Sequence, residues 1–233
     1  MLFKRKEVIT KYIDYNNKQS VFDHIRNQIE DGHQVYIITP MIDESDAMDL
    51  QNALAVYERT KKYYKGFCEV GLIHGKLKTE EKEEVMRKFY ENETQILVAT
   101  SVIEVGVNVV NATTIVILDA DRFGIAQLHQ MRGRVRRSDD QAYCFMISDS
   151  TVETSIKRMR LVEETNDGFA LAEEDLMIRG AGDLFGEKQS GGVTFKMADV
   201  VVDTEILNLA NQCADEIINS GKLFNNKELL QAL

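Results

Sequence analysis

This 233-residue sequence has no long apolar run, no even set of cysteines and only one proline. No run approaches the roughly 18 apolar residues that span a membrane, and the opening stretch MLFKRKEVITKYIDYNNK has no apolar core of a signal peptide. Cys68, Cys144 and Cys213 are odd in number and widely separated, which predicts reduced core residues of a cytosolic protein, without a metal site. We therefore expect no membrane contact. Because Pro40 is the one proline, most turns must rely on Gly, Asn and Asp.

An excess of basic residues is also missing. The chain has 28 Lys and Arg against 38 Asp and Glu, a net charge of −10. This weighs against a protein whose whole surface binds nucleic acid, but it permits a local basic strip. The content of 44% hydrophobic and 28% charged residues is typical of a soluble globular protein. The length accommodates one domain and an appendage.

A phosphate-binding loop of the G-x-x-x-x-G-K-[ST] type is absent. The nearest segment, GLIHGKLK (Gly71–Lys78), has one residue too few between its glycines, and Leu77 stands where the hydroxyl residue belongs. Asp43 and Glu44 follow an apolar run, as Mg²⁺-binding acids do in nucleotide hydrolases. Without a phosphate-binding loop, we interpret them as helix-capping and first-turn residues.

Strands and helices alternate over residues 1–150, which predicts an α/β domain: an open parallel sheet with helices on both faces. Short apolar runs, mostly rich in β-branched residues, predict strands at Gln34–Met41, Cys68–Ile73, Thr94–Thr100, Thr114–Ala120 and Ala142–Ser148. The stretches between them predict helices at Ser20–Glu30, Asp46–Tyr64, Thr79–Tyr90 and Ile125–Arg132. Function in such sheets gathers in the loops at the carboxyl ends of the strands.

The pattern changes in residues 151–233, which we predict to be a second segment. TVETSIKRMRLVEET and FALAEEDLMI predict two helices joined by the turn-forming NDG. A glycine-punctuated loop, RGAGDLFGEKQSGG, follows, and then a final helix near Asp203–Asn219.

Two polar stretches carry the candidate chemistry. In LVATSVIEVGVNVVNA, Thr100 and Ser101 end a buried strand, where hydroxyls and free amides can meet a phosphate backbone, and Glu104, Gly106 and Asn108 follow in a loop. In QLHQMRGRVRR, the spacing Q-x-x-G-R-x-x-R holds Gln130, Gly133, Arg134 and Arg137, and guanidinium groups suit phosphate. Judged alone, the first stretch could be a cap and an ordinary turn, and the second a solvated basic turn.

Together these stretches resemble motifs V and VI of superfamily 2 helicases. The resemblance implies a second RecA-like motor domain, of the kind found as the C-terminal domain of P-loop helicases. It implies that arginine fingers, Arg134 and Arg137, act with Gln130 on ATP held by a first motor domain. Gly106, Asn108 and Gly133 would contact the nucleotide. DNA contacts would come from Thr100, Ser101, Glu104 and, in the H-G segment, His74.

The segment ETNDGFALAEEDLMIRGAGDLFGEKQSG (Glu164–Gly191) resembles the translocation motif of RecG-type DNA helicases, and a related version occurs in the transcription-repair coupling factor. The continuation FKMADVVVDTEIL favours RecG. The resemblance implies that Arg158, Arg179 and Gln189 couple motor movement to DNA translocation. From the residues alone, a solvated pair of Arg179 with Glu174 or Asp175 would be the simpler interpretation.

The implied function is the C-terminal part of an ATP-dependent double-stranded-DNA translocase of the bacterial cytosol, associated with the nucleoid. It would act on branched DNA in fork reversal, Holliday junction processing, repair and recombination. Its partners would be that DNA and the first motor and wedge domains of the same polypeptide. ATP and Mg²⁺ would be bound mainly by the first motor domain, so we expect this chain alone to be inactive. The sequence begins close to where a second motor domain would begin, and whether Met1 is the native start stays open. The alternatives are a non-catalytic DNA- or partner-binding module, or the coupling factor.

Three positions depart from the family pattern. Arg136 stands where motif VI usually has glycine, Asn108 where motif V usually has aspartate, and Val110 where RecG-like chains often have proline. Asn108 can still hydrogen-bond a ribose, although it brings no charge. The first two departures bear on nucleotide affinity and turnover rather than on the fold.

Overall fold

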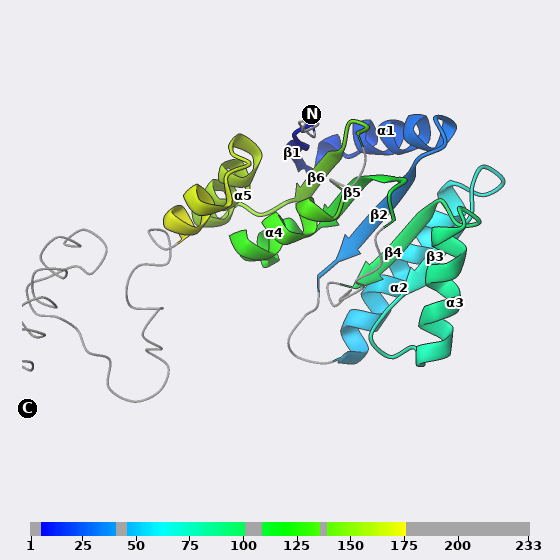
Figure 1. Ribbon diagram of the computed structural model, residues 1–233. Coiled ribbons are helices and arrows are strands. Elements are labelled where there is room, and N and C mark those ends of the chain that lie inside the picture. The colour runs from blue at the N-terminus through cyan, green and yellow to red at the C-terminus, as the bar shows by residue number, and fades with distance from the viewer. Residues whose placement is uncertain (1–5, 41–45, 101–108, 136–138, 176–233) are drawn as a thin grey trace, which may run out of the picture. The chain divides into compact units, whose positions relative to one another are not determined.

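The computed structural model describes residues 6–40, 46–100, 109–135 and 139–175 (Figure 1). Within these ranges six parallel strands form one sheet in the order β1-β6-β5-β2-β4-β3. The strands are β1 (Ile9–Asp14), β2 (Gln34–Thr39), β3 (Val70–Ile73), β4 (Ile96–Thr100), β5 (Ala112–Leu118) and β6 (Tyr143–Ser148). The predicted α/β fold with an open parallel sheet is confirmed.

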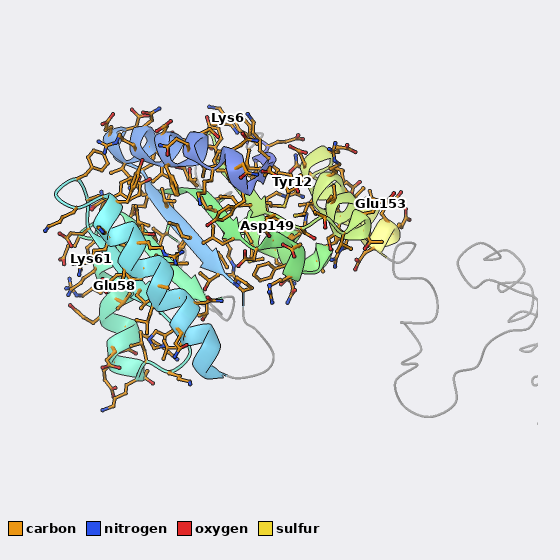
Figure 2. All side chains as sticks on the ribbon, turned by 180° about the vertical axis from the view of Figure 1, so that it is seen from behind. Lys6, Tyr12, Glu58, Lys61, Asp149 and Glu153 are labelled. Atoms are coloured by element: carbon orange, nitrogen blue, oxygen red, sulfur yellow. The ribbon has the colours of Figure 1, made fainter. Side chains whose placement is uncertain are left out.

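Helices cover both faces of the sheet. One face carries α1 (Gln19–Glu30) and α2 (Asp46–Tyr63), and Figure 2 is seen from that side, with Glu58 and Lys61 labelled on α2. The other face carries α3 (Thr79–Tyr90) and α4 (Ile125–Arg132). Short 3₁₀ turns are η1 (Tyr15–Asn17), η2 (Ala120–Arg122) and η3 (Gly133–Val135), and α5 (Glu153–Glu164) packs against β1 and α4.

The predicted helices at Thr79–Tyr90 and Ile125–Arg132 are confirmed to the residue, and the other strands and helices predicted for residues 1–150 are shifted by one or two residues at their ends. Strand β1 was not predicted. It is an edge strand whose Ile9 is 41% exposed, and it contains Lys11 and Asp14, so it lacks a continuous apolar run. Its pairing with β6 joins Ile9 to Tyr143, a long-range contact that no local pattern records.

The core lies between the central strands and the helices. In β4, the residues Ile96–Ala99 are fully buried, and Ile25 of α1 and Phe89 of α3 are buried beneath the two faces. Each fully buried Val, Leu, Ile or Phe side chain contributes about 1.5–3 kcal/mol on burial. No helix in the described part of the chain is both long enough and apolar enough to cross a bilayer.

Two of the three cysteines belong to this core. Burial raises the pKa of Cys144, in β6, to about 12 and that of Cys68 to about 11. Both are free thiols. A raised pKa keeps a thiol protonated and therefore unreactive at neutral pH, as predicted for reduced core residues. Cys213 lies outside the described residues.

Two helical stretches follow β6 at the positions that the sequence predicted. After α5 ends at Glu164, residues 165–167 form the connection and helical structure resumes at residues 168–175. The hydroxyl of Thr165 accepts a hydrogen bond from the amide of Asp167 (3.1 Å), and the Asp167 carboxylate accepts one from the amide of Phe169 (2.9 Å). This second bond satisfies an amide of the new helix, as an N-terminal cap does.

The chain divides into two compact units after Ala172, and all strands and numbered helices lie in the first unit. The predicted boundary at residue 150 separates a motor domain from a translocation segment by function, and it stays a prediction. The predicted glycine-rich loop and the helix at Asp203–Asn219 lie outside the described residues.

Candidate functional site

The carboxyl ends of β2, β4 and β3 form one continuous edge. Thr39 and Thr100 are register partners in β2 and β4, and the Thr39 hydroxyl donates to the backbone oxygen of Ala99 (3.3 Å). In β3, Ile73 is the partner of Ala99, so His74 follows at the position beside Thr100. The structure therefore brings two predicted DNA-contacting residues, His74 and Thr100, to adjacent strand ends.

These two residues differ in accessibility. Thr100 is only 5% exposed, whereas His74 is half-buried. The pKa of His74 is lowered, first by burial and then by the nearby Lys82, so its imidazole is neutral at pH 7. Its Nδ1 has no hydrogen-bond partner among the described residues, while Lys82 donates to the backbone oxygen of Gly75 (2.9 Å). This nitrogen is itself buried, so it is an unsatisfied polar atom of the site and not an exposed contact point.

The second part of the candidate site is the α4–η3 segment. Helix α4 begins after Gly124, whose amide donates to the Gln127 side chain (3.0 Å), and it places Ile125 and Leu128 in the core. Its opposite face is exposed at Gln130, and Arg134 is exposed in η3. Gln130 and Arg134 are four residues apart, so they lie near one another on the outward side of the segment.

Gly133, which ends α4, has no packing reason to be glycine. Its backbone is right-handed helical (φ −63°, ψ −16°), which any residue adopts. A Cβ placed there would meet no described atom within 4 Å. Because Gly133 has no side chain, there is open space beside Arg134 among the described residues. A ligand held by another part of the protein could approach there.

By contrast, the glycine of the false phosphate-binding loop is explained by packing. Gly71 lies in the interior of β3, where a Cβ would come within 3.1 Å of the Thr94 side chain and 3.3 Å of Leu97. A phosphate-binding loop follows a strand, whereas Gly71 lies within one. The rejection of a phosphate-binding loop at Gly71–Lys78 is confirmed.

Arg132 is the residue whose role the sequence pattern did not reveal. It is 3% exposed, unlike Arg134 two positions later. Its Nη1 donates to the backbone oxygens of Val162 (2.7 Å) and Thr165 (2.8 Å). The signal was available, since Arg132 follows Ile125 and Leu128 at helical spacing and so falls on the buried face of α4.

Arg158, predicted as a translocation residue, lies on the first helix of the hairpin. Its Nη2 donates to the backbone oxygen of Asp121 in η2 (3.1 Å) and to the Ser155 hydroxyl (3.0 Å). The Asp121 carboxylate in turn accepts a hydrogen bond from Ser148 at the end of β6. Arg158 therefore ties α5 to the turn that precedes α4.

Several predicted residues lie outside the described ranges, and their positions stay predictions. They are the motif V residues Ser101, Glu104, Gly106 and Asn108, the second finger Arg137 with the departure Arg136, the translocation residues Arg179 and Gln189, and the acids Asp43 and Glu44. The described part of the site is thus His74, Thr100, Gln130, Gly133, Arg134 and Arg158.

The family is defined by residues 17–139, which match the helicase conserved C-terminal domain. The chain belongs to this family. Residues 165–231 match the C-terminal part of domain 3 of ATP-dependent DNA helicase RecG. The second match favours RecG over the coupling factor, and the resemblance to RecG-type helicases inferred from the sequence is confirmed.

Curated relatives agree with both matches. The chain is 47% identical over 224 residues to ATP-dependent DNA helicase RecG of Bacillus subtilis, covering 96% of this chain and 33% of the relative. It is 48% identical over 223 residues to RecG of Staphylococcus aureus, covering 95% and 32%. The chain thus spans about a third of the length of these relatives.

Solved structures give the same picture. A RecG bound to a three-way DNA junction matches with a TM-score of 0.68 and 40% identity, over 89% of this chain and 26% of that one. Domain 2 of the DEAD-box helicase Mss116p, bound to an RNA duplex, matches with a TM-score of 0.52 and 17% identity, over 72% and 68%. The second likeness supports the fold alone.

Proposed function

We propose that this chain is the second motor domain and translocation segment of an ATP-dependent DNA translocase of the RecG type, acting on branched DNA in fork reversal and Holliday junction processing. The observation that carries the proposal is the outward display of Gln130, Gly133 and Arg134 on α4–η3, in a chain whose relatives are RecG helicases. A second motor domain needs these groups on its surface because the nucleotide is held by the first motor domain.

In the proposed reaction, water attacks the γ-phosphorus of ATP and the bond to the β-phosphate oxygen breaks. Arg134 and Arg137 neutralise the charge that develops on the transferring phosphoryl oxygens, and Gln130 helps to position the reacting groups. The open space at Gly133 admits the phosphates, and Gly106 and Asn108 would contact the nucleotide. A first motor domain holds most of the ATP together with Mg²⁺.

DNA would be contacted at the edge formed by the ends of β3 and β4. The residues for which we propose these contacts are His74 and Thr100 at the strand ends, together with Ser101 and Glu104, which follow Thr100 in the sequence. Backbone contacts of this kind position a protein on DNA without reading its sequence. Arg158, Arg179 and Gln189 would transmit motor movement to the duplex, and a wedge domain elsewhere in the polypeptide would engage the branch. The protein would work in the cytoplasm, at the nucleoid.

A second candidate function is a non-catalytic module that docks on DNA or on a partner motor. It is favoured by the net charge of −10 and by the two substitutions Asn108 and Arg136 in otherwise family-like motifs. Under this alternative the surface formed by Gln130 and Arg134 would bind a partner and would take no part in ATP hydrolysis.

The test compares ATP hydrolysis by the 233-residue chain with hydrolysis by the native polypeptide that carries it, with and without branched DNA. We expect no hydrolysis by the chain alone and DNA-stimulated hydrolysis by the native polypeptide. An immunoblot with an antibody to this segment gives the size of that polypeptide in its source cells. A band of 233 residues, with salt-sensitive duplex binding but no DNA-stimulated hydrolysis, would favour the binding module instead.

A further inference from the structure

Arg132 joins the helix that carries the finger to the end of the first hairpin helix. Val162 lies in the last turn of α5, where backbone oxygens lack partners within the helix. Arg132 supplies one hydrogen bond to that oxygen and another to Thr165, just beyond the helix end. A cation at a helix C-terminus is also favoured by the helix dipole. Arg132 is thus a cap for α5 that comes from 30 residues earlier in the chain.

His129 extends this contact to the start of the next helix. Its Nδ1 lies 2.7 Å from Nη2 of Arg132, and because guanidinium can only donate, Nδ1 accepts. Burial, and then Arg132, lower the pKa of His129, which keeps the ring neutral as this bond requires. On its other side, Nε2 would be 3.1 Å from a Cβ at Gly168. The glycine therefore allows the imidazole to sit against the turn.

The two side chains lie three residues apart on α4. Arg132 bonds to Thr165 at the start of the connection 165–167, and His129 lies beside Gly168, the first residue after it. Arg134 follows Arg132 after a single residue, Gly133, and Val135 fixes η3 in the core. A displacement of the α4–η3 segment, which carries Arg134, therefore displaces the connection as well. From there the chain enters the helix at residues 168–175.

We propose that Arg132 is a positioning residue that fixes the hairpin connection to the arginine-finger segment, with His129 and Gly168 as its fitted surroundings. This inference rests on the proposed function. It assigns to Arg132 a task separate from that of Arg134: Arg134 acts on the nucleotide, whereas Arg132 converts the position of α4 into the position of the hairpin. The guanidinium fork suits this task because it holds several acceptors in fixed directions, which the compact ammonium of lysine does not.

The experiment uses the native polypeptide and measures two rates on branched DNA: ATP hydrolysis and strand displacement. Arg132→Met is expected to lower the displacement obtained per ATP hydrolysed by about tenfold or more, in keeping with the loss of hydrogen bonds to a charged group. DNA-stimulated hydrolysis should fall much less. Arg132→Lys should be intermediate. Arg87→Met is the matched control, because Arg87 is an exposed arginine of α3 that pairs with Glu84, and it should leave the ratio unchanged.

Because Arg132→Met leaves buried carbonyls without donors and can unfold the protein, a second variant keeps the test decisive. Gly168→Ala presses a Cβ against His129 and should lower the same ratio, and adding His129→Ala should restore it by making room. The inference is overturned if Gly168→Ala leaves the ratio unchanged, if His129→Ala fails to restore it, or if hydrolysis and displacement fall in parallel. A wild-type polypeptide without DNA-stimulated hydrolysis would overturn the proposed function and, with it, this inference. An active wild type with unaltered variants would overturn the inference alone.

Discussion

Arg158 of α5 donates a hydrogen bond to the backbone oxygen of Asp121, 37 residues earlier in the chain, at a distance of 3.1 Å. Arg132, the last residue of α4, donates a hydrogen bond to the backbone oxygen of Val162 near the end of α5. Arg158 therefore fastens α5 to η2, and Arg132 fastens the end of α5 to α4. A residue predicted as part of a translocation device thus has a structural partner within the motor unit itself.

This contact predicts a stability effect for Arg158→Met. The substitution removes the bond to Asp121 and the bond to Ser155, and hydrogen bonds from a charged group contribute about 1.5–3 kcal/mol. Since Arg158 is partly exposed, we expect a loss of about 1–2 kcal/mol in the free energy of unfolding, measured by urea denaturation. Lys157→Met on the exposed side of the same helix should change little. Equal midpoints for both variants would show that the tie contributes nothing to the fold.

Gly133 predicts the opposite combination of stability and activity. The right-handed backbone at Gly133 accepts alanine, which reduces the entropy of the unfolded chain, so Gly133→Ala should leave stability unchanged or raise it by about 0.4–1 kcal/mol. The added methyl group should nevertheless obstruct the nucleotide and slow ATP hydrolysis by the native polypeptide. Thermal unfolding and steady-state hydrolysis are the two measurements. Ala126→Ser, at an exposed position of the same helix, is the control, and a Gly133→Ala protein with full turnover would argue against a nucleotide at this point.

His24 predicts a pH dependence of stability. Its ring packs edge-on against Tyr143 (4.4 Å between centroids) and Phe145 (4.9 Å), and its pKa is lowered, first by burial and then by Lys11. The folded state therefore binds this proton less readily than the unfolded state. The stability that His24 contributes is present above its ordinary pKa and is lost as the pH falls through and below that value.

The pKa values of His74 and His129 are lowered too, so they add to the same trend. We expect the free energy of unfolding to fall between about pH 7 and pH 5, above the range in which carboxylates titrate. His24→Gln should flatten the slope in part. A slope identical in wild type and His24→Gln would exclude the assigned role of His24.

The sequence was informative wherever local pattern and burial coincide. The central strands are buried on both faces and read as apolar runs, and α3 has acids at its start and bases at its end, so both kinds of element could be located. Edge strand β1 could not be predicted, because its stability comes from pairing with β6. The paired residues Ile9 and Tyr143 are 134 positions apart in the chain. Such a contact leaves no local periodicity.

The arginine cluster shows the same limit within the candidate site. The run from Arg132 to Arg137 looks uniform as a sequence, yet the fold buries Arg132 and exposes Arg134. Helical spacing from Ile125 could have separated them, but the acceptors of Arg132 could not have been inferred, since they are backbone oxygens on another helix. The family resemblance suggested a role for Arg134, and the structure showed that Arg132 has a different environment.

The central claim is that Arg134 acts on ATP from the surface of this domain, and the most direct test is turnover by Arg134→Ala in the native polypeptide. The account predicts that DNA-stimulated ATP hydrolysis falls by roughly three to five orders of magnitude, as for arginine fingers in GTPases. DNA binding should remain nearly intact, and Arg87→Ala on α3 should hydrolyse ATP normally. Hydrolysis by Arg134→Ala at the wild-type rate would contradict the account.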